Sequence, residues 1–134
     1  MKITDLRIGN IVDYETIYYR VDSLVGKDKV ILTAINHEWE PEPAGIAEIV
    51  GISLTPEILK TLGFEPLNKK TTHLWIKNVG GYRYIRYHDE VHYMEFEHLS
   101  SFARVPWAIK EVHQMQNACT DYGLDVKRIF PDLK

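Results

Sequence analysis

An apolar stripe near the C-terminal end of the chain predicts its one long helix and limits what the other segments can form. In residues 104–119, apolar side chains recur at helical spacing: Val105, Ala108, Ile109, Val112, Met115 and Cys119. Pro106 suits the first helical position, where its missing N–H has no helical partner, and Gly123 suits the position after the end. We therefore expect an amphipathic helix that covers the apolar face of a sheet.

Polar side chains interrupt this stripe. Gln116 falls inside it, and His113 and Asn117 lie just outside its edge, one turn apart. A buried glutamine loses roughly 1–3 kcal/mol unless it finds hydrogen-bond partners. The structural interpretation is that Gln116 and His113 bond to backbone groups of the sheet under the helix. The functional interpretation is that His113, Gln116 and Asn117 line a small polar pocket.

Residues 72–98 predict a three-stranded antiparallel meander beneath this helix, because apolar and polar side chains alternate in three short segments. The expected strands are Thr72–Lys77, Tyr82–His88 and Val91–Glu97. Their pairing decides which side chains are buried, because a slip of one residue exchanges the two faces of a sheet.

We assume a pairing in which Lys77 lies opposite Tyr82 and Tyr87 lies opposite His92. One face then forms a core, with the members Leu74, Ile76, Ile85, Tyr87, Met94 and Phe96. The other face is aromatic and charged, a mixture typical of protein interfaces. Its candidate binding residues are Trp75, Tyr82, Tyr84, Arg86 and Tyr93. The alternative is that these rings only stabilise the meander through cross-strand pairs, or that the N-terminal part covers them.

Short alternating segments in residues 1–53 predict a small antiparallel sheet that curls into a partial barrel, similar in pattern to SH3-like barrels. Two prolines and three glutamates in residues 37–43 predict a loop there, because proline cannot serve the ladder of a sheet. The pattern indicates no activity by itself, since small barrels of this kind host many functions.

Residues 54–64 carry the signals of a short helix. Thr55 suits the N-cap, Pro56 the first helical position and Gly63 the left-handed position after the end. This helix would join an N-terminal part, residues 1–53, to a second part, residues 54–134. We expect the two parts to share one core in an α+β fold.

The composition argues against several classes of protein. A net charge of −3 without a basic run disfavours a general binder of nucleic acid backbones. A single cysteine excludes an internal disulfide and a thiolate-rich metal site. No apolar run approaches the roughly 20 residues of a membrane span, and residues 1–10 lack the apolar core of a signal peptide. We expect a cytoplasmic protein that does not bind a membrane.

No motif in the sequence identifies a reaction. The segment Val79-Gly80-Gly81 suits a hairpin turn rather than a phosphate-binding loop, and there is no nucleophile elbow. The four histidines between residues 73 and 98 do not converge in the assumed pairing. We therefore expect neither a metal nor a cofactor, and the sequence favours a binding protein over an enzyme.

Three stretches of the sequence resemble known proteins: Asp5–Val12 (DLRIGNIV), Leu54–Phe64 (LTPEILKTLGF) and Val112–Asn117 (VHQMQN). In content and order they are similar to segments of small proteins from gut Bacteroidales bacteria and their phages, a group without an assigned activity. The chain departs from that group at Ala118–Asp125, where the group has an aromatic-rich segment. The resemblance implies a phage- or mobile-element-associated domain and assigns no catalytic residue.

Together these observations predict a non-enzymatic binding or accessory domain, which binds a protein partner or a second copy of itself through the aromatic sheet face. The alternative is a small enzyme or a ligand-binding pocket around His113, Gln116 and Asn117. A third hypothesis is a weak binder of single-stranded nucleic acid, whose bases would stack on the aromatic rings. Glu95 and Glu97 argue against it, because such sites need a basic groove.

Overall fold

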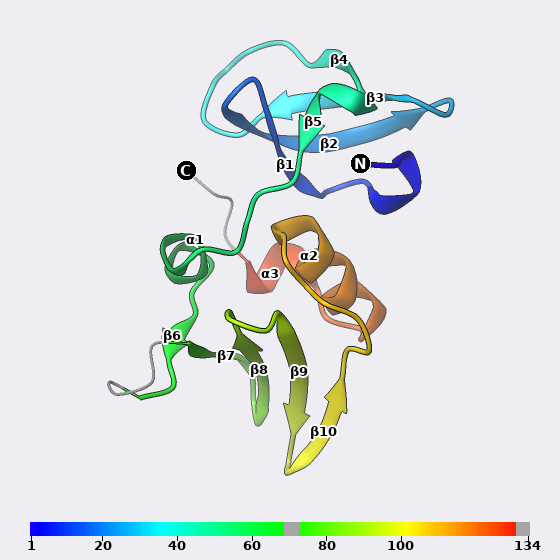
Figure 1. Ribbon diagram of the computed structural model, residues 1–134. Coiled ribbons are helices and arrows are strands. Elements are labelled where there is room, and N and C mark those ends of the chain that lie inside the picture. Colours follow the sequence, from blue (N-terminus) through cyan, green and yellow to red (C-terminus); the bar gives the residue numbers. More distant parts are fainter. Residues whose placement is uncertain (69–72, 131–134) are drawn as a thin grey trace.

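The computed structural model describes residues 1–68 and 73–130. Two antiparallel five-stranded sheets lie on either side of a helix, α2 (Val112–Asp121), as Figure 1 shows. The expected α+β class is confirmed. Within the described ranges, no helix is both long enough and apolar enough to span a bilayer.

The first sheet is curled and has the strand order β4-β3-β2-β1-β5. Its strands are β1 (Ile11–Tyr14), β2 (Ile17–Val25), β3 (Lys29–Ala34), β4 (Glu42–Gly45) and β5 (Ile49–Val50). Two short 3-10 helices, η1 (Ile3–Asp5) and η2 (Ile46–Glu48), precede β1 and β5. The predicted loop at 37–43 is confirmed for residues 37–41, whereas residues 42 and 43 belong to strand β4. Strand β4 contains Pro43, and a sheet tolerates proline in an edge strand such as this one.

The second sheet has the order β10-β9-β8-β7-β6. Its strands are β6 (Glu65–Pro66), β7 (Leu74–Gly80), β8 (Arg83–His88), β9 (Tyr93–His98) and β10 (Ser101–Arg104). The three central strands correspond to the predicted meander, whose first expected residue, Thr72, lies outside the described residues. Strands β6 and β10 extend the sheet by one strand on each side, and the sequence pattern did not predict them.

The pairing of β7 with β8 differs from the assumed one by three residues. Trp75 lies opposite Tyr87 rather than opposite Tyr84. The cause is the turn, because β7 continues through a bulge to Gly80 and the chain reverses only after it. An odd shift exchanges the two faces of a strand. The prediction that Trp75 lies on the open face is therefore wrong, and its side chain is 3% exposed.

The same shift moves Leu74 and Ile76 from the predicted core face to the outer face, where both are half-buried. Strand β9 is shifted by two residues against β8, so that Tyr87 lies opposite Met94 rather than His92. An even shift preserves the faces. The remaining predicted core residues of this sheet are buried as expected: Ile85, Tyr87, Met94 and Phe96.

Helix α2 begins later than the apolar stripe predicts. Residues 105–111 are not helical, since the N–H groups of Val105 and Ile109 donate to the carbonyl oxygens of Met94 and His92, at 3.0 and 2.9 Å. Val105 and Ile109 thus belong to an irregular segment that comes after β10 and is hydrogen-bonded to residues at the start of β9. The end is as predicted, because the chain leaves the helix through Gly123 with a φ of 94°.

Helix α1 (Pro56–Thr61) confirms the predicted short helix. Thr55 Oγ1 accepts a hydrogen bond from Ile58 N–H at 3.3 Å, and Gly63 ends the helix with a φ of 90°. Helices α1, α2 and α3 (Val126–Ile129) pack on the inner face of the second sheet.

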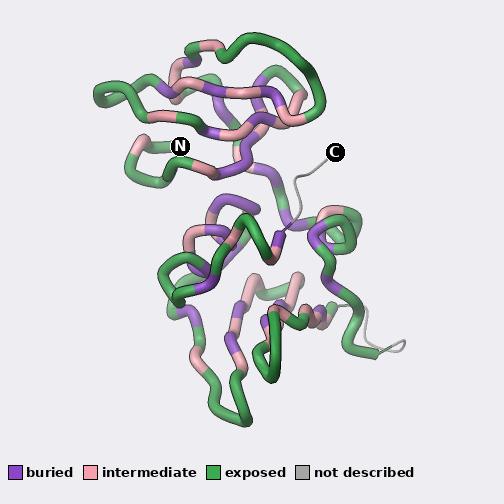
Figure 2. Tube along the Cα trace, turned by 180° about the vertical axis from the view of Figure 1, so that it is seen from behind, coloured by how far each residue is buried: buried purple, intermediate pink, exposed green. Residues whose placement is uncertain are grey.

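Two apolar cores result from this arrangement. The larger one lies between the second sheet and the helices, and the smaller one lies within the first sheet. Ile11 and Ile52 come from the N-terminal part of the chain but belong to the larger core. Figure 2 shows buried residues along the strands and around α2, and exposed residues along the outlying turns. Helix α2 is therefore the element against which both halves of the molecule pack.

Candidate functional site

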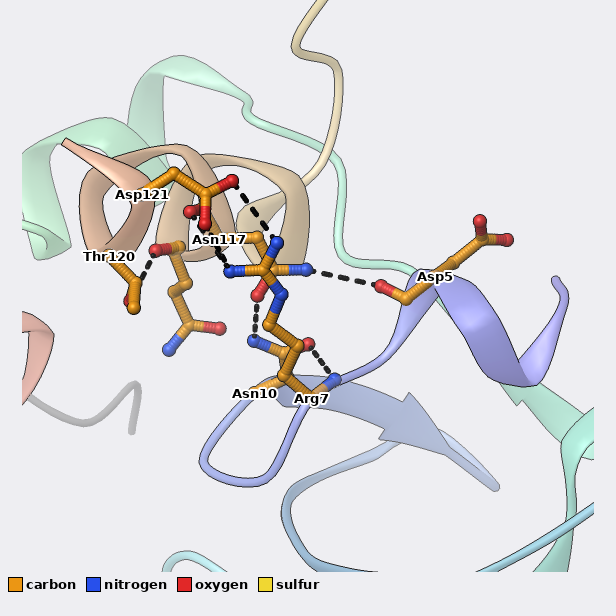
Figure 3. A network of polar contacts seen from close by, with 7 residues as sticks. Asp5, Arg7, Asn10, Asn117, Thr120 and Asp121 are labelled. Atoms are coloured by element: carbon orange, nitrogen blue, oxygen red, sulfur yellow. Dashed lines mark hydrogen bonds and ion pairs between the residues drawn. The ribbon is translucent and has the colours of Figure 1, made fainter. Parts of the chain in front are cut away.

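Polar side chains of α2 hold residues 5–11 against the helix, and we call these contacts the seam (Figure 3). Arg7 forms a two-point ion pair with Asp121, with Nη1–Oδ1 and Nη2–Oδ2 distances of 2.7 and 3.1 Å. Asn10 donates to Asn117 Oδ1 at 2.8 Å, and Asn117 donates to the carbonyl oxygen of Asp5 at 3.1 Å. The hydrogen bonds from Arg7 lower the pKa of the Asp121 carboxyl group.

Gln116 is the buried part of the seam. Its Oε1 accepts a hydrogen bond from Ile11 N–H at 2.9 Å, and its Nε2 donates to the carbonyl oxygen of Gly9 at 3.4 Å. Both partners are backbone groups, as the structural interpretation of Gln116 predicts, but they lie at and just before the start of β1 and not in the meander. Asn117 also uses its side chain in the seam. Of the predicted polar cluster, His113 alone has no contact of this kind in the described part of the chain.

His113 is buried, at 2% exposure, but it lacks the backbone hydrogen bond expected from the sequence. Its Nδ1 has no hydrogen-bond partner among the described residues. Its Nε2 lies 4.0 Å from Glu111 Oε1, which is too far for a direct hydrogen bond. Burial lowers the pKa of His113 below its ordinary value, although the carboxylates of Glu111 and Asp5 act in the opposite direction. The imidazole is therefore neutral at pH 7.

A pocket of about 600 Å³ lies beside His113, between α2 and the N-terminal part of the chain. We call it the Glu111 pocket. Its walls come from residues 1–7, from residues 49–51 and from residues 107–121. The lining residues with the most informative chemistry are Asp5, Gly51, Trp107, Glu111, His113 and Gln114. Asn117 also lines this pocket, whereas Gln116 does not.

The structure fixes Glu111 in this pocket from two sides. Glu111 is the N-cap of α2 and forms a capping box with Gln114, whose Oε1 accepts from Glu111 N–H at 3.1 Å. Gly51 lies directly against its carboxylate, and a Cβ atom on Gly51 would be 2.1 Å from Glu111 Oε2. A glycine at this position therefore leaves the space that the carboxylate occupies. Sequence reasoning missed Glu111, because the usual cap signal begins with Ser, Thr, Asp or Asn, and a glutamate at this position does not match it.

The aromatic sheet face differs from the predicted one. Tyr84, Arg86 and Tyr93 do lie on the outer face, but Trp75 belongs to the core, where its Nε1 donates to Asp89 Oδ2 at 2.9 Å. Tyr82 sits in the turn before β8 and is largely exposed.

Two members of this face, Arg86 and Tyr93, are paired within the molecule. Arg86 Nη2 lies 2.8 Å from Glu97 Oε1, and the Tyr93 hydroxyl donates to the Glu95 carboxylate. The guanidinium of Arg104 stacks on the Tyr93 ring at 4.3 Å from its centroid. The polar groups of Arg86 and Tyr93 therefore already have partners, which leaves this face fewer free groups for another protein.

Other chemistry-bearing residues do not gather into a site. In residues 1–68 and 73–130, no group of three or more histidine, cysteine, aspartate or glutamate side chains could hold a metal ion. His73 Nδ1 lies 2.9 Å from Asp89 Oδ1 on the surface. Cys119 is fully buried, and burial raises the pKa of its thiol far above the ordinary value.

Comparison of the chain with protein-family models gave no match, and searches of curated proteins and of solved structures gave no significant match. Function must therefore be inferred from the chemistry of the pocket and of the exposed surfaces.

Proposed function

We propose that this protein is a non-enzymatic binding domain whose ligand enters the Glu111 pocket. The observation that carries the proposal is a pocket of about 600 Å³ lined by Glu111 and by the buried His113, whose Nε2 lies 4.0 Å from Glu111 Oε1, beyond hydrogen-bond distance. Buried polar groups are rarely left without partners, so a carboxylate and an imidazole nitrogen that face each other across a pocket at this distance point to a ligand between them. The volume lies within the roughly 300–1,000 Å³ of small-molecule sites.

The lining favours binding over catalysis. No serine, cysteine or lysine is found among the described residues of the pocket wall, so three of the common enzymatic nucleophiles are missing from this wall. Asn117 and Asp121 also line it, but their side chains already serve the seam. The contacts of the seam hold Asn117 and Asp121 in place, so this wall is formed before a ligand binds. Small-molecule sites are usually preformed in this way.

Nuclear magnetic resonance of the three tryptophans tests this proposal. Trp107 lines the pocket and is 58% exposed, Trp39 is exposed in the loop between β3 and β4, and Trp75 is buried. A fragment library is expected to contain compounds that shift the indole N–H signal of Trp107, assigned with a Trp107→Phe variant. The signals of Trp39 and Trp75 should stay in place and serve as internal controls. A library in which no compound moves the Trp107 signal selectively would contradict the proposal.

Self-association through the hairpin of β9 and β10 is the second candidate function, and one observation favours it. Leu99 and Ser100 form its turn with φ values of 49° and 69°, a conformation that suits glycine or asparagine. Leu99 is nevertheless apolar and 63% exposed, and Phe102 on edge strand β10 is also exposed. Strained residues in such positions often serve function. The hairpin tip lies at the end of the second sheet away from the first sheet (Figure 1).

A double variant, Leu99→Asn with Ser100→Gly, tests this second candidate. The variant is expected to be about 1 kcal/mol more stable, because the left-handed turn is no longer strained. If the hairpin mediates self-association, light scattering should show a dimer for the natural chain and a monomer for the variant. Because the variant should be more stable than the natural chain, its unfolding would not explain the loss of the dimer. A natural chain that stays monomeric at high concentration would remove this candidate.

Three further predictions from the sequence are kept as proposals: the association with phages or mobile elements, the barrel type of the first sheet, and the location of the protein in the cell. The association with phages or mobile elements rests on the three resembling stretches, two of which contact each other in the seam. The assignment of the first sheet to the SH3-like barrels is supported by its curled antiparallel order. A cytoplasmic location rests on the sequence alone.

A further inference from the structure

We infer that the Glu111 pocket takes an organic cation, meaning an ammonium, amidinium or guanidinium group. This inference rests on the proposed function and names the ligand class for the same site. The donor set of the pocket, its charge balance and its aromatic wall each point to that class.

The charge balance of the lining is negative. It contains the carboxylates of Asp5, Glu111 and Asp121, against Arg7 and the amino group of Met1. Arg7 is already paired with Asp121 at 2.7 Å. In the described ranges, no lysine, arginine or terminal amino group lies within 4.0 Å of the carboxylate of Asp5 or Glu111. Because Asp5 Oδ2 also accepts a hydrogen bond from the Lys2 N–H at 2.8 Å, the Glu111 carboxylate is the main group available to a positive ligand.

The geometry of Glu111 and His113 fits a group with several N–H donors. Glu111 Oε1 and His113 Nε2 are 4.0 Å apart. A single nitrogen at about 2.9 Å from each can donate to both, because a neutral imidazole offers one acceptor nitrogen. An ammonium or guanidinium group can donate in both directions at once. A carboxylate or phosphate ligand has no such donors and would meet the Glu111 carboxylate at close range.

Trp107 supplies the aromatic wall. Its ring lines the pocket and remains more than half exposed without a ligand. Tryptophan is the side chain on which cations stack most favourably. A cation bound to Glu111 would lie beside the Trp107 indole, which is exposed to solvent when no ligand is bound.

The test uses three compounds of the same size that differ in charge: benzamidine, benzamide and benzoate. Their affinities are measured by titration of the Trp107 indole N–H signal of the full chain. We expect benzamidine to bind at least about tenfold more tightly than benzamide, since hydrogen bonds to charged groups are the stronger ones. Benzoate should bind most weakly of the three. The binding of benzamidine should weaken at high ionic strength.

Two variants test whether the Glu111 carboxylate is the group that binds benzamidine. Glu111→Gln removes the charge and keeps the shape, and Gly51→Ala keeps the charge but displaces the carboxylate from its position. Both should weaken benzamidine about tenfold or more, while the buried Trp75 signal shows that the fold survives. Glu57→Gln is the matched control, because Glu57 also stands at the start of a helix but lies outside the pocket.

The outcomes separate this inference from the proposed function. Equal affinity for benzoate and benzamidine, or an unchanged affinity in Glu111→Gln, would overturn the cation assignment while leaving a binding pocket. Failure of all three compounds and of the fragment library to move the Trp107 signal would overturn both. Comparison of agmatine with the peptide Gly-Arg-Gly identifies the source of the cation. Tighter binding of agmatine supports a free small molecule, and tighter binding of the peptide supports an arginine of a partner.

Discussion

Replacing Trp75 by alanine should lower the free energy of unfolding by about 3–5 kcal/mol, whereas the same change at Tyr84 should cost about 1 kcal/mol or less. Trp75 is buried opposite Tyr87, and its indole N–H donates to Asp89 at 2.9 Å. Its removal leaves a large cavity in the core. Tyr84 lies half-buried on the outer face. Urea unfolding followed by far-ultraviolet circular dichroism measures both costs without depending on tryptophan fluorescence.

The Tyr84→Ala variant is the matched control for Trp75→Ala, because each change removes one large ring from the same sheet. The register inferred from the sequence placed both rings on one face, opposite each other, and it therefore predicts similar costs. Two small and equal losses would contradict the observed pairing of β7 with β8. A large loss for Trp75 alone would support it.

Replacing Gln116 by methionine should cost about 2–3 kcal/mol, because it leaves the buried N–H of Ile11 without an acceptor. Both hydrogen bonds of the Gln116 side chain go to backbone groups, and methionine fills a similar volume without replacing them. The amide proton of Ile11 should then exchange with solvent much faster. The amides of Ile85 and Phe96 in the second sheet should keep their slow exchange. Hydrogen exchange followed by nuclear magnetic resonance measures both sets.

Gln114→Met controls for the change of residue type on the same helix. Gln114 is half-buried, and its side chain accepts hydrogen bonds from the N–H groups of Lys110 and Glu111. Loss of this cap should cost about 1 kcal/mol and should not affect the Ile11 amide. Fast exchange of Ile11 in both variants would mean that the seam does not depend on Gln116.

Elements with local signals could be predicted from the sequence. Helix α1 formed where Thr55, Pro56 and Gly63 indicate it, because a cap, a first-turn proline and a left-handed stop act over a few residues. The start of α2 could not be predicted in the same way. Val105 and Ile109 fit the helical period, but their N–H groups bond to Met94 and His92 of another segment. A periodic pattern records burial and not the backbone conformation that achieves it.

The register of β7 failed for a similar reason. Leu74, Trp75 and Ile76 are all apolar, so alternation does not decide which side faces the core. The position of the turn determines the register of β7 against β8, because the chain reverses only after Gly80. Strand β9 has a clearer alternation, with Met94 and Phe96 between glutamates and aromatic rings, and its faces were predicted correctly.

The candidate site could be predicted in part. His113 was recognised as a polar residue in an awkward position, and it does line the pocket. Glu111 and Gly51 were missed, because the importance of each depends on the other, and they are 60 residues apart in the chain. Nothing in a single sequence reveals that a glycine makes room for a distant carboxylate.

The seam has a consequence for how the chain acquires its structure. Its hydrogen bonds join residues separated by 105 to 114 positions, whereas β1, β2 and β3 pair through short hairpins. On the ribosome, the first sheet can therefore form long before α2 has been synthesised, with Ile11 and Ile52 still in water. Contacts of such separation are slow to close. We expect docking of residues 5–11 onto α2 to be the last and slowest step of folding.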